Sequence, residues 1–329
     1  MQDLAALGLV GVPNWPNHGK PYMLPNWLDP WPNPFYANVA AAGYGGHGVD
    51  LAHLMDLWLA LPLALLFIAA KIAMTKFVFL RLAAALGVRK SKTAGKFAYQ
   101  MWLFSFYTAS TVFGYLAQRG GGWLAFPQND ESTIAMYRDF PSPPSWEITW
   151  CVTFEVTFYL SEILWLFVEA RRSDFLEYLL HHIVSLILIA MSYSGYDHRP
   201  GCYILLLHDS SDIFLCLGKC FHYAGLTGLS NAAFGIFVSG CVFMRLYCLP
   251  ILGYYMFYAS TTARMAAVNF WVLVCLLFGV IQLLHVYWFT LIVNVISRLM
   301  RGVRGDNRSE SDRDDDGKAE QRRVNRKKQ

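Results

Sequence analysis

The sequence has few charged residues for its length. Only 15% of its 329 residues are charged, whereas soluble domains average about 25%. Residues 301–329 contain 10 of the 27 Lys and Arg and 7 of the 23 Asp and Glu, so the rest of the chain is poorer still. With 55% hydrophobic residues and a mean hydropathy of +0.33, the composition excludes soluble, fibrous and disordered proteins and predicts a membrane protein.

Signatures of several other protein classes are also missing. The net charge of +4 comes mostly from residues 301–329, which argues against a nucleic-acid partner. The seven cysteines form no CxxC pair, and we interpret them as apolar packing residues rather than zinc ligands or disulfides. There is no glycine-rich nucleotide-binding loop and no set of histidine boxes for a di-iron centre. We therefore expect neither a metal nor a cofactor.

Apolar stretches long enough to cross a bilayer recur from residue 51 onward. A helix of about 20 residues spans the hydrocarbon core, and polar segments separate the stretches. The predicted spans are 54–76, 97–117, 149–170, 177–195, 202–218, 231–254 and 269–297. The sequence thus predicts an all-α fold, a polytopic membrane bundle of about seven transmembrane helices.

Basic residues concentrate in alternate loops between these spans. Positively charged loops stay on the cytosolic side, so we expect a lumenal N-terminus and a cytosolic C-terminus. No basic segment precedes an apolar stretch at the start of the chain, and a cleavable signal peptide is not expected. The basic residues that set this orientation are Arg81, Arg89, Lys90, Lys92, Lys96, Arg171, Arg172, Lys219, Arg298, Arg301 and Arg304.

Composition divides the chain into four segments. Residues 1–50 are rich in Pro and Trp and are predicted to be an irregular lumenal segment. Residues 51–91 contain the first transmembrane helix and a basic cytosolic loop, and 92–300 contain the remaining spans. Residues 301–329 are expected to be a disordered, charged cytosolic tail. Ser309 and Ser311 lie among acidic residues there, which suits either phosphorylation or a plain solubilising tail.

Ionisable side chains collect in the fourth and fifth predicted spans. The fourth carries His181 and His182, with Ser185 one turn later, and the fifth contains the run 208–212, His-Asp-Ser-Ser-Asp. Ionisable groups inside a membrane are costly, so each of them is a candidate functional residue. Helical spacing places His208, Asp209 and Asp212 on one face with Ser211. It also makes the two histidines of the pair point about 100° apart.

The short connection at 196–201 makes these two spans antiparallel neighbours, so the histidine pair and the carboxylates can meet. An imidazole beside a carboxylate gains basicity and a fixed tautomer, which suits a general base or a nucleophile. The alternative is a buried polar network that only holds helices together. The candidate catalytic residues are His181, His182, Asp209 and Asp212, supported by His208, Ser185 and Ser211.

An ordered series of motifs surrounds these candidates. It comprises Arg171-Arg172-Ser173-Asp174-Phe175, His181-His182, Ser192-Tyr193, Arg199, Gly201, Leu207-His208-Asp209-Ser210-Ser211-Asp212 and Gly218-Lys219. The series resembles the longevity-assurance motif of ceramide synthases, which are multispan enzymes of the endoplasmic reticulum with a TLC domain, placed here at 92–300. Ser185 stands where the family usually has Thr, and the homeobox-like insert of many animal members is absent.

The resemblance implies transfer of a fatty acyl group from acyl-CoA to the amine of a sphingoid base, without a further cofactor. The histidine pair would act as general base or acyl acceptor in a cavity for lipid and acyl-CoA. Arg171, Arg172 and Lys219 would bind the CoA phosphates, unless they only follow the positive-inside bias. Apart from the resemblance, Glu155 and Glu162 lie seven residues apart on one stripe of the third span, where they should face the bundle or a cavity and either contact substrate or serve packing. The implied partners are fatty acyl-CoA, a sphingoid base and the lipid bilayer, and a homo- or heterodimer stays open.

Two rival functions remain at this stage. Fatty-acid elongases are also multispan acyl-CoA enzymes, but their HxxHH box needs a histidine where this chain has Tyr178. A non-enzymatic TLC-domain protein for lipid sensing or trafficking typically lacks the complete His and Asp set. Two chemical routes also remain open, namely direct attack of the amine on the thioester and passage through an acyl-imidazole.

Overall fold

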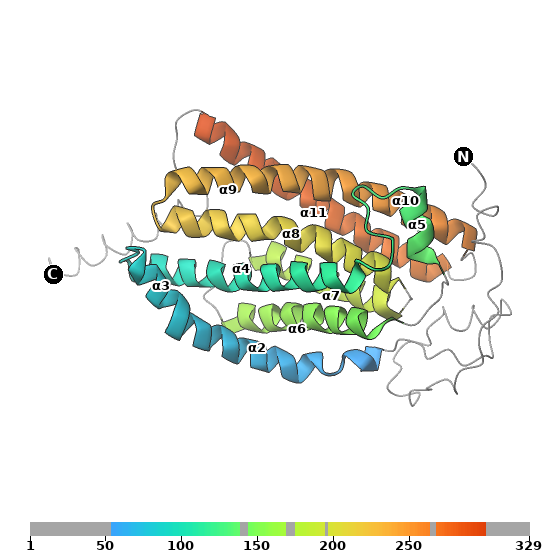
Figure 1. Ribbon diagram of the computed structural model, residues 1–329, viewed down its shortest axis with the longest axis horizontal. Coiled ribbons are helices and arrows are strands. Elements are labelled where there is room, and N and C mark those ends of the chain that lie inside the picture. Colours follow the sequence, from blue (N-terminus) through green and yellow to red (C-terminus); the bar gives the residue numbers. More distant parts are fainter. Residues whose placement is uncertain (1–53, 139–143, 169–174, 195–196, 264–267, 301–329) are drawn as a thin grey trace, which may run out of the picture.

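The computed structural model describes residues 54–138, 144–168, 175–194, 197–263 and 268–300 (Figure 1). Regular structure within these ranges is helical, with no strand, which confirms the predicted all-α class. The predicted segments 1–50 and 301–329, with Ser309 and Ser311, lie outside the described residues. Arg171 and Arg172 do as well.

The long helices lie side by side in a bundle, with α3 at one end and α5 at the other (Figure 1). We refer to these as the α3 end and the α5 end. The elements are η3 (Leu54–Leu57), α2 (Ala60–Met74), η4 (Thr75–Phe79), α3 (Leu80–Ala85), α4 (Ser91–Gln118), α5 (Asp130–Tyr137), α6 (Trp146–Val168), α7 (Phe175–Ser194), α8 (His198–Tyr223), α9 (Thr227–Gly240), η5 (Cys241–Cys248), α10 (Leu249–Ala263) and α11 (Val268–Met300).

Within the described residues, seven long helical segments correspond to the seven predicted stretches, because α2–α3 and α9–α10 each continue through a π-helical turn. In this part of the chain, five segments are long and apolar enough to span a membrane, namely Ala60–Ala85, Trp146–Val168, Phe175–Ser194, Thr227–Met256 and Leu273–Ser297. The chain is therefore a multi-pass membrane protein. Helices α4 and α8 carry more polar residues and pack most extensively against each other. That both cross the membrane stays a prediction.

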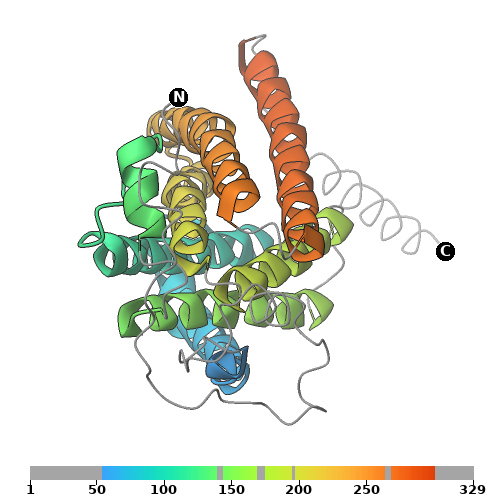
Figure 2. The same cartoon turned by 90° about the vertical axis from the view of Figure 1, so that its right-hand side faces the viewer.

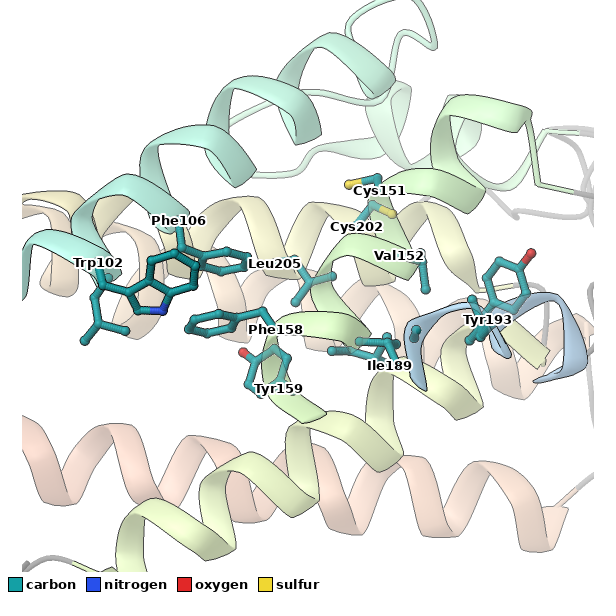
Figure 3. Close-up of a cluster of buried hydrophobic side chains, with 14 of the residues drawn as sticks. Trp102, Phe106, Cys151, Val152, Phe158, Tyr159, Ile189, Tyr193, Cys202 and Leu205 are labelled. Atoms are coloured by element: carbon teal, nitrogen blue, oxygen red, sulfur yellow. The ribbon is translucent and has the colours of Figure 1, made fainter. Parts of the chain in front are cut away.

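Stacked aromatic rings join α4 to α6 in the core of the bundle (Figure 3). The rings of Phe106 and Phe158 are nearly parallel, with centroids 3.5 Å apart. The same cluster continues through Tyr159 to Ile189 of α7 and Leu205 of α8. Removing such rings from lipid and packing them together fixes α6 between α4 and α7, and this arrangement positions the polar groups described below.

The turn from α8 to α9 depends on one glycine. Gly225 has φ +75°, a left-handed conformation that other residues adopt only with strain. It allows the amide of Leu226 to bond the carbonyl of Phe221 at 2.9 Å, which ends α8 in a Schellman motif. Helix α9 consequently returns along α8, while α11 lies on another side of the bundle and contacts α7 and η5 (Figure 2).

Candidate active site

A mostly apolar cavity lies between α6, α7, α8, α10 and α11. Its atom-free space is about 720 Å³ when the open mouth is included. His181, Ser185 and His208 line it together with Tyr159. Two of the predicted ionisable groups and one predicted supporting hydroxyl therefore face a common cavity, enclosed by apolar side chains such as Ile204, Met256 and Phe278.

The two adjacent histidines face different neighbours, as their spacing predicts. Their ring centroids are 5.5 Å apart with an interplanar angle of 83°. The His181 ring lies 5.0 Å from Trp288, and its Nδ1 has no hydrogen-bond partner among the described residues. His182 is 4% exposed and packs between Tyr159 and Tyr178, at 5.3 and 4.0 Å between ring centroids.

The backbone sets the tautomer of His182. Its Nδ1 lies 2.9 Å from the carbonyl oxygen of Tyr178, one turn earlier in α7. A carbonyl only accepts a hydrogen bond, so Nδ1 carries the proton and the lone pair of the neutral ring is on Nε2. An imidazole in this state can take up a proton or attack a carbonyl carbon through Nε2.

Asp209 belongs to a cluster of three polar side chains from α4, α6 and α8. Ser110 Oγ lies 2.5 Å from Asp209 Oδ2 and also bonds Glu155 Oε1. The two carboxyl groups interact with each other, and both residues are at most 2% exposed. One serine proton cannot serve two carboxylates, so one carboxyl group of the cluster must carry a proton of its own.

Asp212 forms an ion pair with a residue of η5. The Nη2 atom of Arg245 lies 2.6 Å from Asp212 Oδ1 and 3.0 Å from the carbonyl oxygen of His208. Arg245 is 7% exposed, so the pair is largely desolvated and strengthened by the low local dielectric. It ties η5 to the face of α8 that carries the predicted site.

His208 forms a pair with a histidine of α11. Its Nδ1 bonds the carbonyl of Ile204 at 2.7 Å, which places a proton on Nδ1. Its Nε2 lies 2.9 Å from Nε2 of His285, and Nδ1 of His285 lies 2.9 Å from Oε1 of Gln282. Ser211 Oγ donates to the carbonyl of His208 at 2.9 Å. His208 and Ser211 therefore both have hydrogen-bond partners inside the bundle.

The predicted orienting role of Asp209 or Asp212 toward the histidine pair stays a prediction. The structure gives Asp209 the partners Ser110 and Glu155, and gives Asp212 the partner Arg245. Glu155 and Glu162 both face the bundle interior as expected, each 1% exposed. Lys219 is half-buried near the end of α8, at the α3 end of the bundle.

A family model of the TLC domain matches residues 96–294. The chain belongs to the TLC-domain family. The match extends from α4 to α11 and contains every predicted site residue except Ser309 and Ser311. Helix α2 lies outside it.

Among relatives of this TLC-domain chain, ceramide synthase 4 of Homo sapiens is 28% identical over 307 residues, which is 76% of either chain. Sphingosine N-acyltransferase lag1 of Schizosaccharomyces pombe is 28% identical over 77% of this chain and 66% of its own length. ASC1-like protein 1 of Oryza sativa is 35% identical over 52% of this chain and 59% of its own. The chain spans half the length of ceramide synthase 4 of Bos taurus.

Several polar residues of this TLC domain entered the site only through the structure. Ser110, Tyr159 and Arg245 each contact a predicted site residue, and Tyr178 contacts His182. Arg245 carries a readable signal, because a lone basic residue within an apolar span needs a buried partner. A serine or tyrosine in an apolar helix carries no comparable signal.

Proposed function

We propose that this chain is a ceramide synthase. It transfers a fatty acyl group from acyl-CoA to the amine of a sphingoid base and releases (dihydro)ceramide and CoA. The observation that carries the proposal is the histidine pair, of which His181 lines an apolar cavity and His182 is buried, in a TLC-domain chain whose relatives are named ceramide synthase and sphingosine N-acyltransferase. The cavity suits lipid tails and keeps water from the thioester.

His182 is the proposed base or acyl acceptor. In the direct route, Nε2 takes a proton from the amine, whose nitrogen forms the C–N bond while the C–S bond breaks, and the thiolate of CoA leaves. In the two-step route, Nε2 bonds to the thioester carbon while the C–S bond breaks and the thiolate of CoA leaves. The amine then attacks the acyl-imidazole carbon, the bond from that carbon to Nε2 breaks, and Nε2 takes up the amine proton. Asp209 or Asp212 supports the histidine pair through the polar side chains that surround the pair. His181 forms part of the cavity wall.

The remaining predicted contacts belong to the same proposal. Arg171, Arg172 and Lys219 bind the phosphates of CoA at the cytosolic mouth of the site, and of the described residues Lys219 lies at the α3 end. Glu155 supports the site from α6. No cofactor beyond the substrates is required. The α3 end is then cytosolic, the N-terminus is lumenal and the C-terminus is cytosolic, in the membrane of the endoplasmic reticulum, as the positive-inside bias supports. A homo- or heterodimer is a further expectation, and cross-linking in membranes measures it.

One assay tests the proposed activity against both rivals. Microsomes that express the full chain receive sphinganine and a panel of acyl-CoAs, and the lipid products are separated by mass spectrometry. We expect ceramide that is absent from microsomes without the chain. Chain lengthening that depends on malonyl-CoA would instead identify an elongase, and a lack of any product would favour a lipid-binding protein.

The histidine assignment has its own test. We expect His182→Ala to lower the rate of ceramide formation by at least about a hundredfold, the contribution of a positioned general base. Retained activity in His181→Ala, His182→Ala and Asp209→Ala alike would contradict the site. Incubation with acyl-CoA alone, followed by peptide mass spectrometry, separates the two routes, since only the two-step route leaves an acyl group on a histidine.

A further inference from the structure

A continuous series of polar contacts runs from α2 to the histidine pair. It starts at Lys71, whose Nζ lies 2.8 Å from Glu162 Oε1 of α6. The two residues are 4% and 1% exposed, and Lys71 Nζ also lies 4.7 Å from the ring centroids of Tyr99 and Trp165. The lysine thus neutralises Glu162, and two aromatic faces provide further stabilisation of its charge.

The second carboxylate oxygen of Glu162 continues the series. The hydroxyl of Tyr99 donates to Glu162 Oε2 at 3.1 Å, and it lies 3.1 Å from the hydroxyl of Tyr178. A tyrosine has one hydroxyl proton, and the charged carboxylate takes that of Tyr99. The bond between the two tyrosines therefore has a fixed direction, with Tyr178 donating to Tyr99.

Tyr178 then contacts His182 in two ways. Its ring centroid lies 4.0 Å from that of the imidazole, and its carbonyl oxygen accepts the proton on Nδ1 of His182. The ring of Tyr178 is held at its far end by the bond to Tyr99, so the face it presents to His182 has one orientation. An aromatic face in this position also favours the positive charge that an imidazole carries while it holds a proton or an acyl group.

We propose that Lys71, Glu162, Tyr99 and Tyr178 are positioning residues for His182, so that α2 is part of the catalytic unit. The inference rests on the proposed function. A buried ion pair between two membrane helices is expensive to assemble, and packing alone would be served as well by apolar side chains. Helix α2 supplies the lysine although it lies outside the matched TLC domain.

The test removes one hydroxyl while retaining the ring. Tyr99→Phe breaks the link between Glu162 and Tyr178, and Tyr178→Phe breaks the same link from its other side. In full-length chain assayed in microsomes, we expect each variant to lower kcat by about ten- to a hundredfold, the cost of a small misplacement at a reacting group. KM for both substrates stays within about twofold, because the cavity is untouched.

Two comparisons separate positioning from general packing. The double variant is expected to be no slower than the slower single variant, because both substitutions break one link. The matched control is Tyr193→Phe, which removes a hydroxyl of the same helix that bonds Thr149 at 3.2 Å and Asp56 at 3.4 Å. It should keep kcat. Any of three results would overturn the inference. Tyr99→Phe and Tyr178→Phe could lower kcat no more than Tyr193→Phe does, they could raise KM, or their effects on kcat could add in the double variant.

A second measurement does not depend on ceramide formation. Diethyl pyrocarbonate modifies the accessible lone pair of an imidazole, and peptide mass spectrometry reports the rate at His182. We expect Tyr99→Phe to change that rate several-fold while Tyr193→Phe leaves it unchanged. If the wild-type chain makes no ceramide, the proposed function fails, and this rate alone then judges the positioning role. An unchanged rate in Tyr99→Phe would overturn it.

Discussion

Glu155 and Glu162 lie one heptad apart on α6 and are equally buried, yet the structure gives them opposite partners. Glu162 pairs with the ammonium group of Lys71 and accepts from Tyr99. Glu155 lies against another acid, Asp209, and shares with it the hydroxyl of Ser110. Glu162 is a charged group that Lys71 neutralises, whereas Glu155 belongs to a cluster that needs an additional proton. Equal burial at equivalent positions therefore does not imply an equal charge state.

The largest effect should come from removing the positive partner. Lys71→Ala leaves a buried carboxylate without its counter-ion, and we expect a loss of about 3–5 kcal/mol in the free energy of unfolding. Titration of the purified protein in mixed micelles with sodium dodecyl sulfate measures this change. A loss below about 1 kcal/mol would mean that Glu162 does not depend on the pair, which contradicts the contrast drawn above.

Removing both charges of the pair should be milder than removing one. In Lys71→Met combined with Glu162→Met, apolar side chains of similar length replace the pair, and such exchanges are often neutral in stability. We expect the double variant to recover most of the stability lost in Lys71→Ala, in the same titration. The double variant should nevertheless form ceramide more slowly than the wild-type chain, because the hydroxyl of Tyr99 has lost the Glu162 carboxylate as its acceptor. Full activity in the stable double variant would count against the positioning role.

An intermediate effect is expected at the hydroxyl between the two acids. Ser110→Ala removes a donor that two buried carboxyl groups share, and an unsatisfied buried acceptor costs about 1–3 kcal/mol. The same titration gives the loss. Ser105→Ala is a matched control on α4 because, among the described residues, its hydroxyl bonds only the carbonyl of Met101 in its own helix. Equal losses of stability in Ser110→Ala and Ser105→Ala would contradict a particular role of the Ser110 hydroxyl between the two acids.

The smallest effect should distinguish the two glutamates directly. Glu155→Gln replaces one acid of a cluster that already carries a proton, and an amide can donate as a protonated carboxyl does. We expect a change below about 1 kcal/mol, whereas Glu162→Gln removes the carboxylate that pairs with Lys71 and costs more. Circular dichroism and the same titration compare the two variants. If Glu155→Gln is the more damaging one, the assignment of their charge states is reversed.

Much of the site was readable before the structure. The scarcity of charges made His181, His182, Asp209 and Asp212 conspicuous, because ionisable groups at membrane depth have few structural uses. Helical spacing correctly predicted that the paired histidines face different neighbours and that Glu155 and Glu162 face the interior.

The partners of those groups were not readable. Nothing local indicates that Asp209 meets Ser110, that Asp212 meets Arg245 or that His208 meets His285, since these contacts join residues 99, 33 and 77 positions apart. Two predicted spans, α4 and α8, also pack most extensively against each other, although neither is among the described helices whose hydropathy suits a membrane span.

The sequence by itself determined the class of the protein, its helical character and the residue types available for chemistry, because composition and the helical repeat act locally along the chain. Only the tertiary structure decided which acid is neutralised by a base, which hydroxyl bridges two acids and which tyrosine faces His182. Those outcomes depend on how helices distant in sequence pack, and packing selects one partner for each buried polar group among several that the sequence allows.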